Sequence, residues 1–313
     1  MGLTVAAIDL GGTHLRTAVV TVDGEVRGRR HARSRVDAGP DAVVDQATRQ
    51  LAESIAEHVA AGGAAPTALG VSSPGPLDPH LGLLLDPPNL PRGFHDYPLA
   101  ERLASATGLP CRVERDTQVA ALGEGRFGAA RGLADYLYLT VSTGVGGAVV
   151  SDGRLLRGER GLAGELGHLL VDADGPMCGC GARGHLEAIC SGTGIARAAS
   201  EVLGRPMTAA EVAAAEDAGD ALAAKVMDYA RRSFAAACVS LVDIFAPRRI
   251  VVGGGVAMGQ GERLLAPARE AVNRFAFREQ AAQVEIVAAA LGDDVGLLGA
   301  VPLLEDAGLL GAG

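Results

Sequence analysis

The chain has 313 residues, of which 48% are hydrophobic and 21% charged, a composition that excludes a disordered chain and supports a large core. Its 28 basic and 37 acidic residues give a net charge of −9, and only 3% are aromatic, so we expect no nucleic-acid or membrane partner. The odd count of five cysteines, with no signal peptide or long apolar run, predicts a cytoplasmic protein.

The first predicted elements are two short strands joined by a glycine-rich turn. Residues 3–8 form an apolar run that ends at Asp9, residues 17–22 are β-branched, and a third strand is expected at 27–34. Because Gly11-Gly12-Thr13 joins strand to strand, the turn does not fit the dinucleotide fingerprint, which leads from a strand into a helix. Its bare backbone amides can still cradle a phosphate.

A helix and two strands follow. Residues 41–60 carry apolar side chains at helical spacing, and residues 68–71 form a buried strand that ends in a turn-rich loop. A strand at 111–113 stops at Glu114-Arg115-Asp116, and residues 117–125 are predicted to be helical. An acidic side chain between a strand and a helix is well placed for catalysis, although the position alone is explained more simply if Asp116 caps the helix.

The strand–turn–strand unit returns roughly 130 residues later. Residues 136–141 and 148–150 flank Ser142–Gly147, a second turn rich in glycine. Two such units in one chain indicate two halves related by duplication, with each turn facing a shared cleft.

Residues 164–187 contain two cysteines, two histidines and two glutamates, most of them beside a glycine. Cys178 and Cys180 flank a single residue, and His168 and His185 are near enough in sequence to complete the tetrahedral nitrogen and sulfur set that Zn²⁺ prefers. Thiolate ligands disfavour magnesium and calcium. The alternative is a glycine-rich loop with two incidental thiols, but the tight spacing favours a metal site.

The last third is predicted to contain a long helix at 221–245, strands at 249–252 and 284–288, and a glycine-punctuated helix at 295–304. Gly253-Gly254-Gly255 lies between a strand and a helix, where missing side chains allow a flat ligand or a phosphate to approach closely.

Together these motifs resemble the ROK family (repressors, open reading frames and sugar kinases), from about residue 4 to residue 304. The resemblance implies the actin-like, ribonuclease-H-related ATPase fold, an α/β fold with two lobes and a cleft between them. We expect the first lobe over residues 1–115, joined by a C-terminal helix at about 296–313, and a larger second lobe over 116–295. The matching segments are Asp9–Thr13, Thr143–Gly147, Gly167-His168, Cys178–Gly181 and Gly253–Gly255.

The resemblance also implies roles for the nucleotide side. Asp9 would help to position Mg²⁺, and Thr13 would contact the γ-phosphate of ATP. The remaining matches to the first phosphate motif, the second phosphate motif and the adenosine motif are Gly11, Gly12, Thr143, Gly144, Gly146, Gly253, Gly254 and Gly255.

On the sugar side, Asp116 matches the family's catalytic aspartate, which accepts the proton of the attacking hydroxyl. Glu165, His168 and Glu187 match residues that hold sugar hydroxyls, and Gly75 lies in a loop that lines the sugar pocket of similar kinases. His168 also matches a zinc ligand, so the metal set implied is His168, Cys178, Cys180 and His185, with the zinc structural.

Three positions depart from the family pattern. Arg115 and Gln118 stand where sugar kinases of the family usually have asparagine, and His185 stands where the last zinc cysteine is usual. Arg115 is a candidate substrate-binding residue. Because arginine only donates hydrogen bonds, it leaves the identity of the sugar in question. We expect its side chain to face solvent or the other lobe, since an unpaired arginine beside a neutral sugar is costly to bury.

The resemblance therefore implies an ATP- and Mg²⁺-dependent hexose kinase, for which we expect glucose and phosphorylation of its 6-hydroxyl. The alternative within enzymes is a kinase for N-acetylglucosamine or N-acetylmannosamine. Among other classes, a ROK repressor would carry a helix-turn-helix segment before the first strand, and a sugar sensor without catalysis would not need Asp9 and Asp116. Homodimers are frequent among similar proteins, and the sequence neither predicts nor excludes one.

Overall fold

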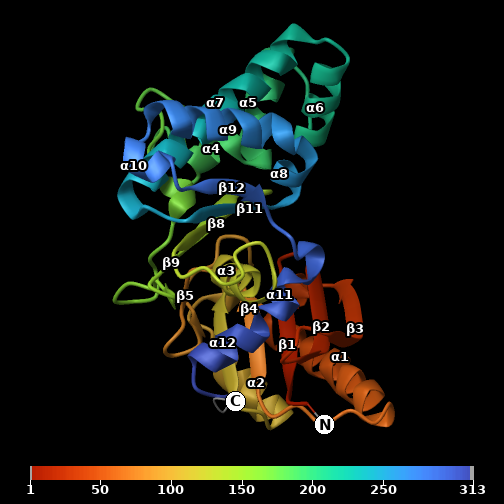
Figure 1. The fold of residues 1–313 in the computed structure, drawn as a ribbon. Coiled ribbons are helices and arrows are strands. Elements are labelled where there is room, and N and C mark those ends of the chain that lie inside the picture. Colours follow the sequence, from red (N-terminus) through yellow and green to blue (C-terminus); the bar gives the residue numbers. More distant parts are fainter. Residues whose placement is uncertain (1, 311–313) are drawn as a thin grey trace. The chain divides into compact units, whose positions relative to one another are not determined.

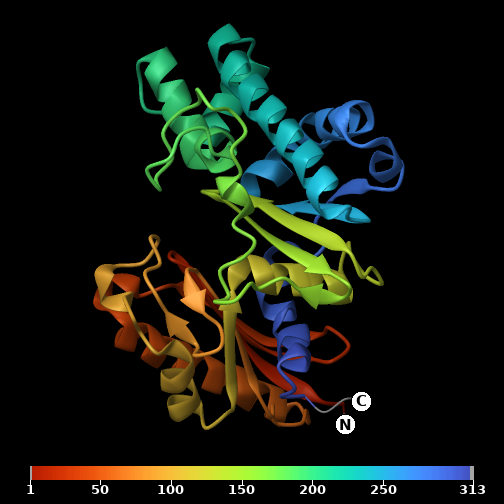
Figure 2. The same cartoon turned by 90° about the vertical axis from the view of Figure 1, so that its left-hand side faces the viewer.

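The computed structural model describes residues 2–310 and divides the chain into two compact units. The first comprises the chain up to Gly132, the segment Arg157–Ala163 and the chain from Leu291 onward, and the second comprises Leu133–Leu156 and Gly164–Ala290 (Figures 1 and 2). Residue 1 and residues 311–313, which the sequence analysis assigned to the first lobe, lie outside the described residues.

The boundary expected between residues 115 and 116 differs from this division. Helix α3 (Asp116–Phe127) belongs to the first unit, where it packs on α11 (Val295–Leu298) and α12 (Ala300–Asp306). Gly123 and Gly299 allow the close approach, because a Cβ on Gly123 would lie 3.3 Å from Gly299 N. Residues 115 and 116 thus meet at a strand–helix corner within the first unit.

The first unit is built on a five-stranded sheet with the order β3-β2-β1-β4-β7. The strand β1 runs antiparallel to β2 and parallel to β4, and β4 runs parallel to β7. The bounds are β1 Thr4–Leu10, β2 His14–Thr21, β3 Val26–Arg33, β4 Leu69–Ser73 and β7 Cys111–Arg115, with a separate hairpin of β5 Leu77–Asp78 and β6 Leu83–Leu84.

Alternate side chains of β1 enter two different cores, as strand geometry requires. Ile8 and its even-numbered neighbours pack with α1 (Pro40–Ala60) and α2 (Leu99–Thr107). Ala7 and its odd-numbered neighbours pack with Leu297 and Val301 on the C-terminal helices. The strand β1 is therefore buried on both faces, which explains its nearly continuous apolar run.

The second unit repeats this strand order, as the two hairpin motifs predict. Its sheet has the order β10-β9-β8-β11-β12, with β8 antiparallel to β9 and parallel to β11. The strands are β8 Tyr136–Val141, β9 Val145–Ser151, β10 Arg154–Leu155, β11 Arg249–Gly253 and β12 Glu285–Ala288.

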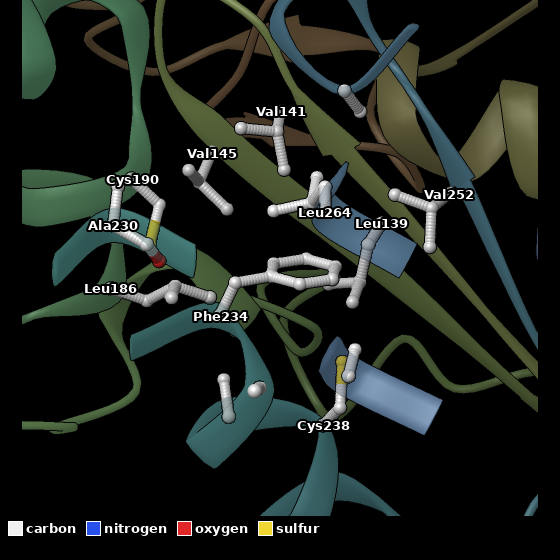
Figure 3. Packing of buried hydrophobic residues seen from close by; sticks show 14 of the residues in the cluster. Leu139, Val141, Val145, Leu186, Cys190, Ala230, Phe234, Cys238, Val252 and Leu264 are labelled. Atoms are coloured by element: carbon white, nitrogen blue, oxygen red, sulfur yellow. The ribbon is translucent and has the colours of Figure 1, made fainter. Parts of the chain in front are cut away.

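Helices cover one face of this second sheet, and α7 is the longest of them. Phe234, in the middle of α7, is fully buried, and its ring lies between Leu186 and the strand residue Leu139 (Figure 3). The helices of the unit are α4 Leu186–Cys190, α5 Gly192–Leu203, α6 Ala209–Asp217, α7 Ala221–Phe245, α8 Gly255–Gln260, α9 Glu262–Phe275 and α10 Arg278–Ala281.

The remaining regular segments are short 3₁₀ turns at Val36–Ala38, Arg92–Phe94, Leu166–His168 and Gly292–Asp294. The single helix expected at 295–304 is found as two helices that meet at Gly299, which keeps right-handed helical angles and packs directly against the backbone of Val119. Among residues 2–310, no helix is both long and apolar enough to cross a membrane.

Candidate functional site

Asp9 lies near the end of β1, where two side chains of the same unit hold its carboxylate. Its Oδ1 accepts a hydrogen bond from Ser72 Oγ at 2.9 Å, and its Oδ2 lies 3.0 Å from Arg16 Nη1. Gly296 of α11 leaves room for this carboxylate, because a Cβ there would lie 2.5 Å from the carboxyl carbon. The Asp9 carboxylate is thus fixed in position and its charge is balanced by Arg16.

The turn that follows is tight and leaves the Thr13 side chain exposed. Gly11 N donates to His14 O at 2.8 Å, and Ser34 N donates to Thr13 O at 2.8 Å. Gly12 lies against another loop, since a Cβ on it would approach Asn89 O to 3.0 Å. The structure therefore brings Asp9, Gly11, Gly12 and Thr13 together at one edge of the first sheet.

Asp116 is the first residue of α3, directly after β7. Its side chain is exposed, and its Oδ1 accepts a hydrogen bond from Thr117 N at 2.7 Å. An acidic group in the first helical turn also interacts favourably with the helix dipole. The carboxylate is therefore both accessible and oriented.

Arg115, the residue before Asp116, is only 4% exposed, so of the two placements expected for it, solvent or the other lobe, the one in solvent is wrong. Its guanidinium donates to Ala163 O within the same unit, which supplies an acceptor that the sequence does not reveal. Its aliphatic part covers Gly75, where a Cβ would lie 2.7 Å from Arg115 Cδ. The predicted sugar-side residues Gly75, Arg115 and Asp116 are thus neighbours.

In the second unit, the turn between β8 and β9 is held from two sides. Ser142 N donates to Gly144 O at 2.9 Å, and Thr143 O accepts from Thr193 Oγ1 at 2.9 Å. Glu187 Oε2 accepts from Val145 N at 3.0 Å, and a Cβ on Gly144 would lie 2.6 Å from that oxygen. This turn therefore carries the predicted phosphate residues Thr143 and Gly144 directly against the predicted sugar residue Glu187.

The three glycines after β11 lie beside the same turn. Gly254 has a φ of 90°, and a Cβ on it would lie 2.5 Å from Val141 O at the end of β8. Gly255 starts α8, with Ser142 Oγ 3.9 Å from its Cβ position. The structure thus brings the predicted phosphate and adenosine motifs of the second unit together, and Gly146 lies in β9 beside them.

His168, Cys178, Cys180 and His185 form one compact cluster, in which the four ligand atoms all lie within 4.8 Å of one another. His168 Nδ1 is 3.1 Å from His185 Nδ1, and Cys180 Sγ is 3.3 Å from the same His185 nitrogen. Cys178 Sγ is 3.9 Å from His168 Nδ1. Tetrahedral bonds of about 2.0–2.3 Å place ligand atoms about 3.3–3.8 Å apart, so this donor set fits Zn²⁺.

The thiol of Cys178 connects the cluster to Glu187. Burial raises the pKa of Cys178; a hydrogen bond from the Cys180 backbone lowers it in part, whereas the Cys180 thiol and the Glu187 carboxylate raise it. A protonated thiol is not a metal ligand, so metal binding here displaces protons. Glu187 Oε1 lies 3.9 Å from Cys178 Sγ, whereas its other oxygen holds the β8–β9 turn.

Sequence reasoning missed several residues that hold the site. Arg16 stands opposite Asp9 in the β1–β2 register, a partner that the hairpin pattern contains but that was not considered. Glu114 is fully buried and Arg157 forms an ion pair with it at 2.8 Å, although the two are 43 residues apart in the chain. No local pattern signals a pair at that separation.

Known proteins are similar to this chain over nearly its whole length. The ROK family model matches residues 5–307. The chain is 36% identical to the glucokinase of Thermotoga maritima, covering 97% of this chain and 98% of that protein. It is 37% identical to an N-acetylmannosamine kinase of Shigella flexneri, covering 97% of this chain and 99% of that protein.

Solved structures agree with this assignment. The ROK hexokinase from Thermus thermophilus superposes with a TM-score of 0.86 at 37% identity, over 96% of this chain and 97% of that one. A ROK family glucokinase from Streptomyces griseus, in complex with glucose and AMPPNP, superposes with a TM-score of 0.77 at 30% identity, over 96% and 98%. The fold is thus the actin-like ATPase fold, and the chain belongs to the ROK family.

Proposed function

We propose that this ROK-family chain is an ATP- and Mg²⁺-dependent hexose kinase that phosphorylates the 6-hydroxyl of glucose, with Asp116 as the general base. The observation that carries the proposal is the accessible, oriented carboxylate of Asp116 at the β7–α3 corner, next to Gly75. The glucokinase of Thermotoga maritima, at 36% identity, supports glucose as the sugar.

A sugar hydroxyl is a poor nucleophile until a base accepts its proton. In the proposed step the Asp116 carboxylate takes that proton, the hydroxyl oxygen forms a bond to the γ-phosphorus, and the bond from that phosphorus to ADP breaks. Glu165, His168 and Glu187 hold other hydroxyls of the sugar, since carboxylates and imidazole nitrogens suit polyol hydrogen bonding.

On the nucleotide side, the two glycine turns carry the proposed phosphate contacts. Gly11, Gly12 and Thr13 form one, and Thr143, Gly144 and Gly146 form the other, while Gly253–Gly255 would contact adenosine. Asp9 would hold Mg²⁺, which neutralises charge on the phosphate oxygens. The AMPPNP complex of the Streptomyces griseus relative supports ATP as the donor.

We also propose that His168, Cys178, Cys180 and His185 hold a structural Zn²⁺. The compactness and chemistry of the donor set support this site. The ion would cross-link the loop and orient His168 and Glu187 without contacting phosphate. A cytoplasmic location belongs to the same proposal, because all five cysteines are free thiols.

N-acetylmannosamine is the second candidate substrate. It is favoured by the 37% identical N-acetylmannosamine kinase and by Arg115 and Gln118, which replace the asparagines usual in sugar kinases of the family. A larger N-acetyl substituent needs a pocket wall different from that of glucose, and the aliphatic part of Arg115 covers Gly75 in the loop proposed to line that pocket.

The deciding experiment measures sugar-dependent ADP release from MgATP across glucose, mannose, N-acetylglucosamine and N-acetylmannosamine. We expect the highest kcat/KM with glucose. A higher value with N-acetylmannosamine would replace glucose by the second candidate. If no sugar stimulated ADP release while sugar binding persisted in calorimetry, the chain would be a sensor rather than a kinase.

A further inference from the structure

The segment of residues 157–163, called the strap below, is fastened to the first unit at both ends. At its start, Arg157 Nε lies 2.8 Å from Glu114 Oε2, and Arg157 Nη2 lies 2.7 Å from Asp306 Oδ2 on α12. At its end, Ala163 O accepts a hydrogen bond from Arg115. The strap therefore joins the end of β7 to the C-terminal helix.

Gln118 closes these contacts into a ring. With its amide oxygen turned toward the guanidinium, Gln118 accepts from Arg115 Nη2 at 2.6 Å, and its amide nitrogen donates to Glu114 Oε1. The side chains of Glu114 and Gln118 are fully buried, and that of Arg115 is 4% exposed. Arg157 pairs with Glu114, so the ring runs from the strap through residues 114, 118 and 115 and back to the strap.

The contacts of such a ring depend on one another. Removing one member of a buried charged pair leaves the other without compensation, and buried polar networks are more cooperative than isolated bonds. Glu114, Arg115 and Gln118 all lie within two positions of Asp116 in the chain, and the Asp116 carboxylate itself is exposed. The ring therefore constrains the backbone on both sides of Asp116 while leaving its carboxylate accessible.

We propose that Arg115, Gln118 and Arg157 are positioning residues that hold the β7–α3 corner through the strap, and that Arg115 and Gln118 are one coupled replacement rather than two independent sugar contacts. The inference rests on the proposed role of Asp116 as the base. It assigns Arg115 a place in an internal ring, in contrast to the asparagine that the family usually has at this position.

A double-mutant cycle tests the coupling. We expect Arg115→Asn and Gln118→Asn each to lower kcat by about tenfold or more for every accepted sugar, with KM within about threefold and the order of sugars unchanged. The double variant should be no worse than the poorer single one, because the ring is already open. Multiplicative losses, or a new order of sugars with Arg115→Asn, would overturn the proposal and make Arg115 a sugar contact.

The strap supplies matched variants. Arg157→Met should lower kcat as the Arg115 and Gln118 substitutions do, whereas Arg157→Lys, which keeps a positive charge, should lower kcat less. Arg160→Met changes an exposed arginine of the same strap and should be silent. Equal effects of Arg157→Met and Arg160→Met would contradict the proposal. If Arg157→Met does not fold, the comparison of Arg157→Lys with Arg160→Met decides.

Hydrogen exchange gives a readout that does not depend on kinase activity. In the full chain, Arg115→Asn should speed amide exchange at least about tenfold within residues 157–163 and at the start of α3, relative to Arg160→Met. Unchanged exchange there would overturn the ring even if kcat fell. A wild-type protein without kinase activity would refute the proposed function alone, since exchange still reports the fastening.

Discussion

At the scale of single residues, Asp116 combines two roles that substitution can separate. Asparagine in its place keeps an acceptor for Thr117 N but cannot take a proton from a hydroxyl. We therefore expect Asp116→Asn to lower kcat by at least about 10²-fold with little change in KM or melting temperature. The measurement is steady-state kinetics with glucose. Glu101→Gln, an exposed carboxylate in the first turn of α2, is the control, and a near-normal kcat in Asp116→Asn would reduce Asp116 to a helix-capping group.

A second prediction at the scale of residues concerns Gly296, whose missing side chain leaves space for the Asp9 carboxylate. Gly296→Ala should displace that carboxylate and raise the Mg²⁺ concentration needed for half-maximal activity by about fivefold or more, with lower kcat. Gly259→Ala is the matched control, since it also lies in a helix and its Cβ position has no neighbour within 4 Å. Identical Mg²⁺ titrations of the two variants would show that Asp9 does not depend on this space.

Single residues also show how far the sequence predicts the site. The motifs and the family resemblance pointed to Asp9, Asp116 and the four Cys and His residues of the cluster, and the structure places the first two near strand ends and brings the last four together, while their roles stay predictions. The placement of Arg115 could not be predicted in the same way. Its acceptor, Ala163 O, is 48 residues away in the chain, and only the folded strap brings the two together.

At the scale of elements, we expect the glycine-rich loop 164–187 to depend on the proposed metal ligands for its shape. We expect about one zinc per purified chain, and His185→Ala should lower both zinc content and sugar affinity, since the loop orients His168 and Glu187. His185→Cys should retain zinc, because a thiolate is an equally good ligand. Zinc is measured by atomic absorption.

His80→Ala, which removes an exposed histidine of the first unit, serves as the control for this loop. Nucleotide affinity should stay near that of the wild type in His185→Ala, because the glycine turns keep their own backbone contacts. Full zinc occupancy in His185→Ala would exclude His185 as a ligand.

Elements with a strong local signal were predicted closely. The helix at 221–245 has the predicted ends, where Asp220 caps its first turn by accepting from Leu222 N at 2.8 Å. The helix expected at 295–304 is found as two helices whose junction, Gly299, keeps helical angles and packs against the backbone of Val119. Packing of that kind is not visible in hydrophobic spacing.

At the scale of the whole molecule, buried thiols predict a loss of stability in alkali. Burial raises the pKa of Cys238 to about 12, against 9.0 for the ordinary thiol. Between these values the unfolded chain releases a proton that the folded chain keeps, so the free energy of unfolding falls as pH rises. The contribution of the protonated Cys238 thiol to the free energy of unfolding is fully present below pH 9 and is lost progressively toward pH 12.

Because of Cys238, the free energy of unfolding should fall with pH at a slope that approaches about 1.4 kcal/mol per pH unit between pH 9.5 and 10.5. Urea unfolding at several pH values measures it, and Cys238→Ala should have a shallower slope by about that amount whatever its stability at pH 7. Parallel slopes for the two proteins would show that the thiol ionises as readily in the folded chain.

The division of the first unit along the chain sets an order of events during synthesis. Its last strand is complete at residue 115, but the buried helical side chains packed on the sheet face that carries Ala7 come from the helices that begin at residue 295. At roughly 5–20 residues per second, a ribosome needs roughly ten to forty seconds to cover that distance. Throughout this interval the nascent chain presents an apolar β-surface, so it is a natural client for chaperones until its last helices emerge.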